Sequence, residues 1–139
     1  MTKEYFQVPA EDIHNNWQLF ASLIENAKIK ANQEDLSFDF CYFQLMNNYW
    51  QLFVVIENEE LQFITVTNVT PVAETFYLTP IFISVMDGKK LDLEFLSKTL
   101  EEIARNFNCS KIIGGGRKGW GKLLSKLGYE PVYMFEKKL

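Results

Sequence analysis

One stretch, Ile112–Tyr129, reads IIGGGRKGWGKLLSKLGY and predicts a strand, a glycine break and a helix in that order. The apolar run Lys111–Ile113 contains β-branched residues, which are typical of a short buried strand. The glycines Gly114–Gly116 permit backbone angles that are closed to other residues. Apolar side chains then recur at helical spacing, at Trp120, Leu123, Leu124 and Leu127. Gly128 is expected to end this helix in the left-handed conformation, and a last strand is expected over residues 130–137.

The first third of the chain predicts one short strand and two helices. Tyr5–Val8 is a candidate strand, and apolar residues at helical spacing predict an amphipathic helix over residues 10–28. The segment Ser37–Met46 suits a helix capped by Ser37, but its aromatic residues would also suit a strand. Periodicity alone leaves these two alternatives open.

The middle of the chain predicts three strands and a helix. The strands are expected over Trp50–Ile56, Leu61–Val69 and Phe76–Val85. Pro80 cannot donate a ladder hydrogen bond, so it predicts a bulge or a point where two strands part. A helix from Asp92 to Phe107 separates the third strand from the strand at 111–113, which predicts a parallel pair.

Composition limits the classes of function. The chain has 139 residues, of which 47% are hydrophobic and 23% are charged, so it is long enough to bury one core. The net charge of −4 argues against sequence-independent nucleic-acid binding, which needs a basic surface. The charge is uneven, because residues 111–139 carry seven Lys or Arg against two Asp or Glu, whereas residues 1–110 carry seven against sixteen. This basic segment could meet an anion or an acidic partner, or it could be a solvated helix face.

The sequence offers few residues that could bind a metal, form a disulfide or span a membrane. His14 is the only histidine and has no second histidine or nearby cysteine as a partner, so no metal site is expected. Cys41 and Cys109 lie in apolar patterns and suggest small buried groups. No apolar run has the length of a signal peptide core or of a membrane span, which predicts a soluble intracellular protein.

The C-terminal motif resembles a known family. Gly-Arg-x-Gly-Trp at Gly116–Trp120 and Leu-Leu-x-Lys-Leu-Gly-Tyr at Leu123–Tyr129 resemble the C-terminal half of GNAT-like proteins encoded by tailed bacteriophages. GNAT denotes the acetyl-CoA-dependent N-acetyltransferase superfamily. The resemblance favours a helix at Ser37–Met46. It implies a single-domain GNAT-like α/β fold over residues 1–139, with a central mixed twisted sheet flanked by about four helices.

The resemblance also implies where acetyl-CoA would bind. In a GNAT domain this cofactor lies between two splayed parallel strands, here Phe76–Val85 and 111–113, and its pyrophosphate usually meets a loop with paired glycines. The corresponding loop Met86–Leu91 has one glycine and an acidic residue, and a lysine pair in such a turn could instead be merely solvated. Arg117 could bind an anion or a structural carboxylate. The candidate cofactor-binding residues are Gly88, Lys89, Lys90, Gly115, Gly116 and Arg117.

The residues that the family uses for catalysis have no counterpart here. The resemblance implies a tyrosine acid at the position of Leu124, which cannot donate a proton, and a carboxylate on the strand Phe76–Val85, which has no Asp, Glu or His. Glu74 and Asp87 flank that strand and could act only through water. No catalytic residue is therefore assigned.

These gaps favour a catalytically degenerate GNAT-like phage protein, a pseudoenzyme that acts through protein partners or self-association as a virion-associated or accessory component. The virion role rests on the resemblance alone, and the expected location is the host cytoplasm or the virion. No cofactor is expected on this hypothesis. The alternative is a divergent acetyl-CoA-dependent N-acyltransferase, in which proximity of acetyl-CoA and an amine supplies much of the rate.

Overall fold

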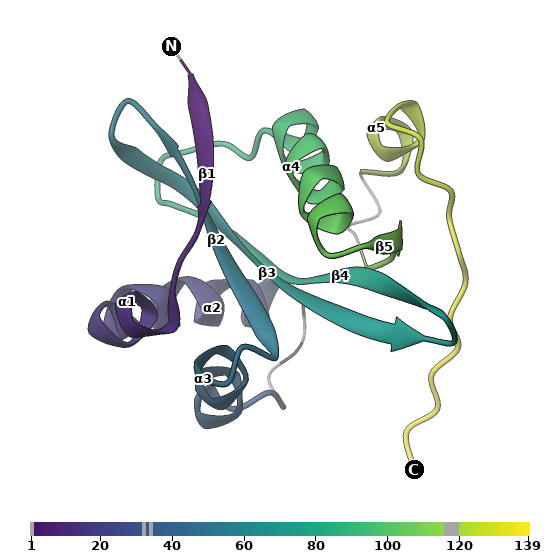
Figure 1. Ribbon diagram of the computed structural model, residues 1–139, viewed down its shortest axis with the longest axis horizontal. Coiled ribbons are helices and arrows are strands. Elements are labelled where there is room, and N and C mark those ends of the chain that lie inside the picture. Colours follow the sequence, from purple (N-terminus) through teal and green to yellow (C-terminus); the bar gives the residue numbers. More distant parts are fainter. Residues whose placement is uncertain (1, 32, 34, 116–119) are drawn as a thin grey trace.

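The computed structural model describes residues 2–31, 33, 35–115 and 120–139 (Figure 1). Its strands form one sheet in the order β1-β2-β3-β4-β5. They are β1 (Lys3–Gln7), β2 (Trp50–Glu57), β3 (Glu60–Val72), β4 (Thr75–Val85) and β5 (Cys109–Ile112). The helices are α1 (Ala10–Asn15), α2 (Trp17–Ala31), α3 (Phe38–Met46), α4 (Leu93–Asn106) and α5 (Gly121–Lys126). Strands β1 to β4 are antiparallel, and β4 pairs with β5 in parallel across α4, as the sequence predicted.

Helices cover both faces of the sheet. In Figure 1, α1, α2 and α3 lie on one face, and α4 lies on the other. On the first face, Ile24 of α2, Leu45 of α3 and Phe82 of β4 belong to one buried cluster. On the second face, Leu96 of α4 packs with Phe63 of β3 in another. These two clusters hold the fold together, because each removes large apolar side chains from water.

Local side-chain hydrogen bonds explain the helix boundaries in the first third of the chain. The helix alternative at Ser37–Met46 is confirmed, since the Ser37 hydroxyl caps α3 by accepting a hydrogen bond from the Phe40 N–H at 3.1 Å. The single helix expected over residues 10–28 is wrong in one respect, because Asn16 divides it into α1 and α2. The Asn16 side-chain amide donates to the Asp12 carbonyl at 2.9 Å, which gives the backbone a partner outside the helical ladder.

The C-terminal part of the chain differs most from expectation. The last strand predicted over residues 130–137 is wrong, because these residues form no strand and lie exposed without a sheet neighbour. The expected helix is present as α5 over Gly121–Lys126, and Trp120, the first residue of the apolar pattern, is partly buried. The predicted helix end is confirmed: Gly128 has φ +91°, the Gly128 N–H donates to the Ser125 carbonyl and the Tyr129 N–H donates to the Leu124 carbonyl. Among the described residues, no helix is long and apolar enough to cross a membrane.

Candidate ligand-binding site

The parallel strands β4 and β5 part beside Pro80. In the pairing of β4 with β3, Pro80 lies opposite Thr67 and Phe82 lies opposite Val66. Ile81 therefore has no partner on β3 and forms a bulge. The pairing of β4 with β5 ends at Leu78, before Pro80 is reached. There the Ile113 N–H donates to the Leu78 carbonyl at 2.9 Å. Both alternatives predicted for Pro80 are therefore confirmed, because a residue without an N–H cannot continue the ladder.

A cavity of about 570 Å³ opens where these strands part. It lies between α4 and the C-terminal region, and most of its wall is apolar. Apolar walls come from β4 through Pro80 and Ile83, from α4 through Leu96 and Leu100, and from the C-terminal region through Trp120 and Leu124. The turn after β5 contributes Gly114 and Gly115. A concave, mostly apolar site of this size is typical of small-molecule binding.

The two glycines of this turn have different roles. A Cβ at Gly114 would lie 3.1 Å from both Cδ and Cγ of Pro80, so the missing side chain lets the turn pack against the β4 bulge. A Cβ at Gly115 would meet no atom within 4 Å. Gly114 therefore shapes the mouth of the cavity, and Gly115 leaves it open.

A small number of polar groups interrupt the apolar wall. Ser97 on α4 is 4% exposed and its hydroxyl donates to the Tyr129 hydroxyl at 3.2 Å, which ties the segment after α5 to α4. Burial raises the pKa of the Cys109 thiol, so this group stays neutral at neutral pH and is a poor nucleophile. Four charged side chains also line the cavity, namely Glu101, Arg105, Lys111 and Glu130. This arrangement suits binding by shape and a few polar contacts.

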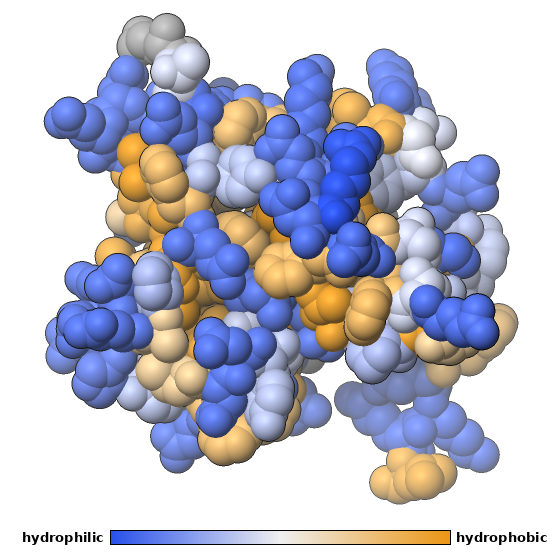
Figure 2. Space-filling model, in the orientation of Figure 1, coloured by the Kyte–Doolittle hydropathy of each residue, from blue (hydrophilic) through white to orange (hydrophobic). Residues whose placement is uncertain are grey.

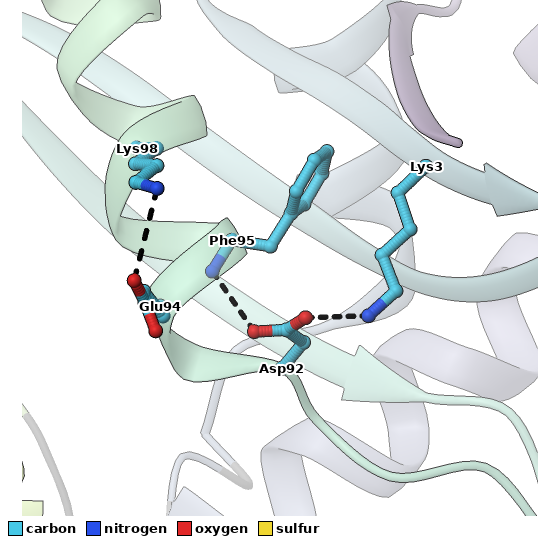
Figure 3. A network of polar contacts seen from close by, with 5 residues as sticks. All are labelled: Lys3, Asp92, Glu94, Phe95 and Lys98. Atoms are coloured by element: carbon cyan, nitrogen blue, oxygen red, sulfur yellow. Dashed lines mark hydrogen bonds and ion pairs between the residues drawn. The ribbon is translucent and has the colours of Figure 1, made fainter. Parts of the chain in front are cut away.

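The N-terminus of α4 already holds an anion, as Figure 3 shows. The Asp92 carboxylate caps the helix by accepting a hydrogen bond from the Phe95 N–H at 3.0 Å. Its second oxygen accepts a hydrogen bond from the Lys3 ammonium, and these two bonds lower the pKa of Asp92. Nearby, Lys98 and Glu94 form an exposed pair at 3.7 Å. A phosphate at this helix end would compete with a carboxylate that is already bound.

The structure separates the residues predicted to contact a cofactor. Gly88 lies in an exposed turn with φ +78°, and the Lys89 ammonium donates to the Glu60 carboxylate at 2.6 Å. None of Gly88, Lys89 and Lys90 lines the cavity, whereas Gly115 does. The other two candidates, Gly116 and Arg117, lie outside the described residues.

Sequence reasoning missed the polar pair Ser97 and Tyr129. Ser97 interrupts the apolar stripe of α4, four residues after Leu93, which is a signal for a buried polar contact or a ligand. Tyr129 stands at the end of the C-terminal motif, directly after Gly128. Its distance of 32 residues from Ser97 explains why no local pattern could pair them.

Comparisons with known proteins support the fold. No family model and no curated protein matches the sequence. The structure is similar to the crystal structure of an aminoglycoside acetyltransferase from an uncultured soil metagenomic sample, at 15% identity, TM-score 0.70 and coverage of 100% of this chain and 99% of that chain. It is also similar to a predicted acetyltransferase with acetyl-CoA from Clostridium acetobutylicum, at 14% identity, TM-score 0.67 and coverage of 99% and 96%.

A third similar structure names the superfamily. This is a GCN5-related N-acetyltransferase from Ralstonia eutropha JMP134, at 12% identity, TM-score 0.72 and coverage of 99% of each chain. At such identities the likeness concerns the fold, which is shared over nearly the whole length. The protein therefore has the single-domain α/β fold of the GNAT acetyltransferases, as its C-terminal motif predicted.

Proposed function

We propose that this protein binds an acyl-CoA in the cavity beside Pro80 and acts as a divergent N-acyltransferase. The observation that carries the proposal is the apolar cavity at the point where β4 and β5 part. One protein of the same fold was crystallised with acetyl-CoA, which supports the choice of ligand. Arg105 and Lys111 line the cavity and would attract the phosphates, and Glu101 and Glu130 would limit where those phosphates lie.

The proposed reaction depends on positioning. The family's tyrosine acid is replaced by Leu124, and Cys109 is held neutral by burial. We therefore propose that the site holds the thioester next to an amine that attacks as the free base. The new amide C–N bond replaces the thioester C–S bond, and the amine proton passes through water to the CoA thiolate that leaves. Proximity of two bound reactants can lower a barrier by about 7–11 kcal/mol. A slow turnover that rises with pH until the amine is deprotonated would follow from this scheme.

A binding experiment tests the proposal first. Calorimetric titration with acetyl-CoA is expected to give micromolar affinity, which corresponds to about −8 kcal/mol. Gly115→Trp should abolish binding, because the new indole enters the open space of the cavity. Gly121→Trp is the matched control, since a Cβ there also meets no atom within 4 Å but the residue does not line the cavity.

The outcome decides between two classes of protein. No binding at millimolar acetyl-CoA would reject the proposal. Binding without release of free CoA, across a panel of amines followed by chromatography, would reject transfer and retain a ligand-binding pseudoenzyme. The protein-binding phage component predicted from the sequence is the second candidate. It is favoured by the exposed apolar residues after α5, and its virion association is supported by the sequence resemblance alone.

A further inference from the structure

Strand β1 forms an open edge of the sheet, at the end opposite to β5 (Figure 1). Among the described strands, β1 pairs only with β2. The Val8 N–H, directly after β1, donates to the Leu52 carbonyl of β2 at 2.9 Å. Because backbone groups alternate in direction along a strand, every second residue of β1 turns its N–H and C=O away from β2. These outward-facing residues are Lys3, Tyr5 and Gln7.

The side chains of β1 leave this edge uncovered. A charged side chain on an edge strand often prevents a second strand from pairing with it. Lys3 is the only lysine of β1, and its ammonium is bound by the Asp92 carboxylate at the start of α4. The Tyr5 ring lies 6.2 Å from the Phe53 ring between centroids, and burial followed by a hydrogen bond to Glu102 raises the pKa of Tyr5. Both side chains are therefore held toward α4, while their backbone groups stay open.

A groove of about 530 Å³ lies between β1 and α4. Figure 2 shows hydrophilic and hydrophobic side chains mixed on the face of the molecule around this edge. One face of α4 lines the groove with Phe95, Lys98, Thr99 and Glu102. The edge of β1 therefore offers space for an added strand as well as hydrogen-bonding groups.

We propose that β1 of one copy pairs antiparallel with β1 of a second copy, in the register that places Tyr5 opposite Tyr5. Lys3 of each copy then lies opposite Gln7 of the other, so all the outward N–H and C=O groups of the strand have partners. A two-fold axis passes through the Tyr5 pair, and the contact closes as a dimer. The sheets of the two copies continue as one sheet.

The side chains favour this register over its two neighbours. On the face away from α4, Glu4 lies opposite Phe6 of the second copy, and the two Phe6 rings, each 49% exposed, become diagonal neighbours within contact reach. One neighbouring register would set Glu4 against Glu4, where like charges repel. The other would set Lys3 against Pro9, which has no N–H to donate.

The two grooves also complement each other in charge. A two-fold axis reverses the direction of α4, so the Lys98 end of one groove lies toward the Glu102 end of the other. The cavity that contains Gly114 lies beside β5, at the opposite end of the sheet from β1. Pairing at β1 therefore leaves that cavity open, and the inference does not depend on acyl-CoA binding.

The test begins with the mass of the full-length protein by light scattering after size-exclusion chromatography. The chain mass is 16.3 kDa, and we expect about twice that mass at high micromolar concentration. Hydrogen exchange of the Tyr5 and Gln7 amides should slow in the dimer and speed up on dilution, whereas the Phe6 amide, which faces β2, should stay protected at both concentrations. A monomer at millimolar concentration would overturn the inference, as would exchange at Tyr5 and Gln7 that does not depend on concentration.

Two substitutions of Gln7 separate its backbone from its side chain. Gln7→Pro removes an outward N–H twice in each dimer but no hydrogen bond to β2, so it should weaken dimerisation by about tenfold or more. Gln7→Ala is the matched control, because it removes the exposed side chain and keeps the N–H. Circular dichroism would verify that both variants are folded. Equal dimer affinities for a folded Gln7→Pro variant and Gln7→Ala would overturn the strand pairing.

A charge exchange tests the register. Phe6→Glu places a second carboxylate opposite Glu4 of the other copy and should weaken the dimer by about fivefold or more. Adding Glu4→Lys to Phe6→Glu turns that contact into a pair of opposite charges and should restore the affinity. Phe43→Glu on α3 is the control, because Phe43 is 53% exposed and does not belong to β1. A double variant as weak as Phe6→Glu alone would overturn the proposed register, as would an equal loss from Phe43→Glu.

Discussion

The sheet body, residues 3–112, and the C-terminal region, residues 113–139, use apolar side chains in different ways. In the sheet body, strands and helices enclose two clusters of buried residues on opposite faces of the sheet. In the C-terminal region, Trp120, Leu124 and Leu127 recur at helical spacing, yet no described residue there is buried. The spacing of apolar residues predicts which side of a helix or strand would be buried. Burial also requires a second surface within contact distance.

The described part of the C-terminal region lacks a second surface against which its apolar side chains could be buried. Helix α4 has 14 residues and packs against strands on the same face of the sheet, whereas α5 has six residues and lies across a cavity of about 570 Å³. Residues 130–139 have no sheet neighbour in the part of the chain that the structure describes. The open cavity and these exposed residues are therefore the two places where a ligand or a partner could supply the missing contacts.

The largest expected difference between the two regions is in the free energy of unfolding that is lost when a phenylalanine in each region is changed to alanine. Phe82→Ala should lower the free energy of unfolding by about 3–5 kcal/mol, because Phe82 is 2% exposed and the change leaves a cavity. Phe135→Ala should change it by less than about 0.5 kcal/mol, because Phe135 is exposed. Urea denaturation at low micromolar concentration would measure both. Equal losses would contradict the contrast between the regions.

A smaller effect is expected at the capped helix of the sheet body. Asp92→Ala should cost about 1 kcal/mol by removing the N-cap of α4, a contact that has no counterpart among the described residues at the start of α5. Asp92→Asn is the control, because an amide oxygen can still accept the Phe95 N–H while the charge is lost. Urea denaturation near neutral pH would compare the three proteins.

The same residue predicts a pH dependence. The hydrogen bond from Lys3, followed by that from the Phe95 N–H, lowers the pKa of Asp92 in the folded state. Its stabilisation is therefore present above the unfolded pKa of about 4 and is lost as the pH falls through the lower folded value. The stability difference between the wild type and Asp92→Asn should shrink as the pH is lowered from 6 to 3. A constant difference would show that the charge contributes nothing.

The glycine turn between the two regions offers a matched pair. Gly114→Ala should destabilise the protein by about 1 kcal/mol, because the new Cβ would lie 3.1 Å from the Pro80 ring and force it to move. Gly115→Ala should stay within about 0.5 kcal/mol of the wild type, because its Cβ would meet no atom. Thermal or urea unfolding would separate them. If Gly115→Ala were the more damaging change, the assigned roles of the two glycines would be reversed.

The smallest effect is expected at the exposed pair of Lys89 and Glu60. The hydrogen bond from Lys89 lowers the pKa of Glu60, so Lys89→Ala should return that pKa to its ordinary value in an NMR titration. Acetyl-CoA affinity should not change, because Lys89 does not line the cavity. A marked loss of affinity would instead support the cofactor role predicted for Lys89 from the sequence.

Local sequence signals predicted the fold well where a few neighbouring residues decide the geometry. Ser37 is the cap that the sequence predicted, and Gly128 ends its helix in the left-handed conformation. Pro80 marks both a bulge and a strand divergence. The C-terminal motif predicted the superfamily fold, although identity with proteins of similar structure is only 12–15%. The helix break at Asn16 was missed, because it depends on one side-chain hydrogen bond that competes with a continuous apolar stripe.

The structure does not bring all the described residues of the predicted site together. Gly115 lines the cavity, but the lysine pair at Lys89 and Lys90 does not, and Ser97 meets Tyr129 only in the folded chain. Caps, turns and bulges are determined by the sequence because their hydrogen-bonding partners lie within a few residues. The tertiary structure decided how far Trp120 is buried, whether residues 130–137 pair as a strand and which residues line the cavity. These features depend on groups that are distant along the chain and on the distance between the surfaces that carry them.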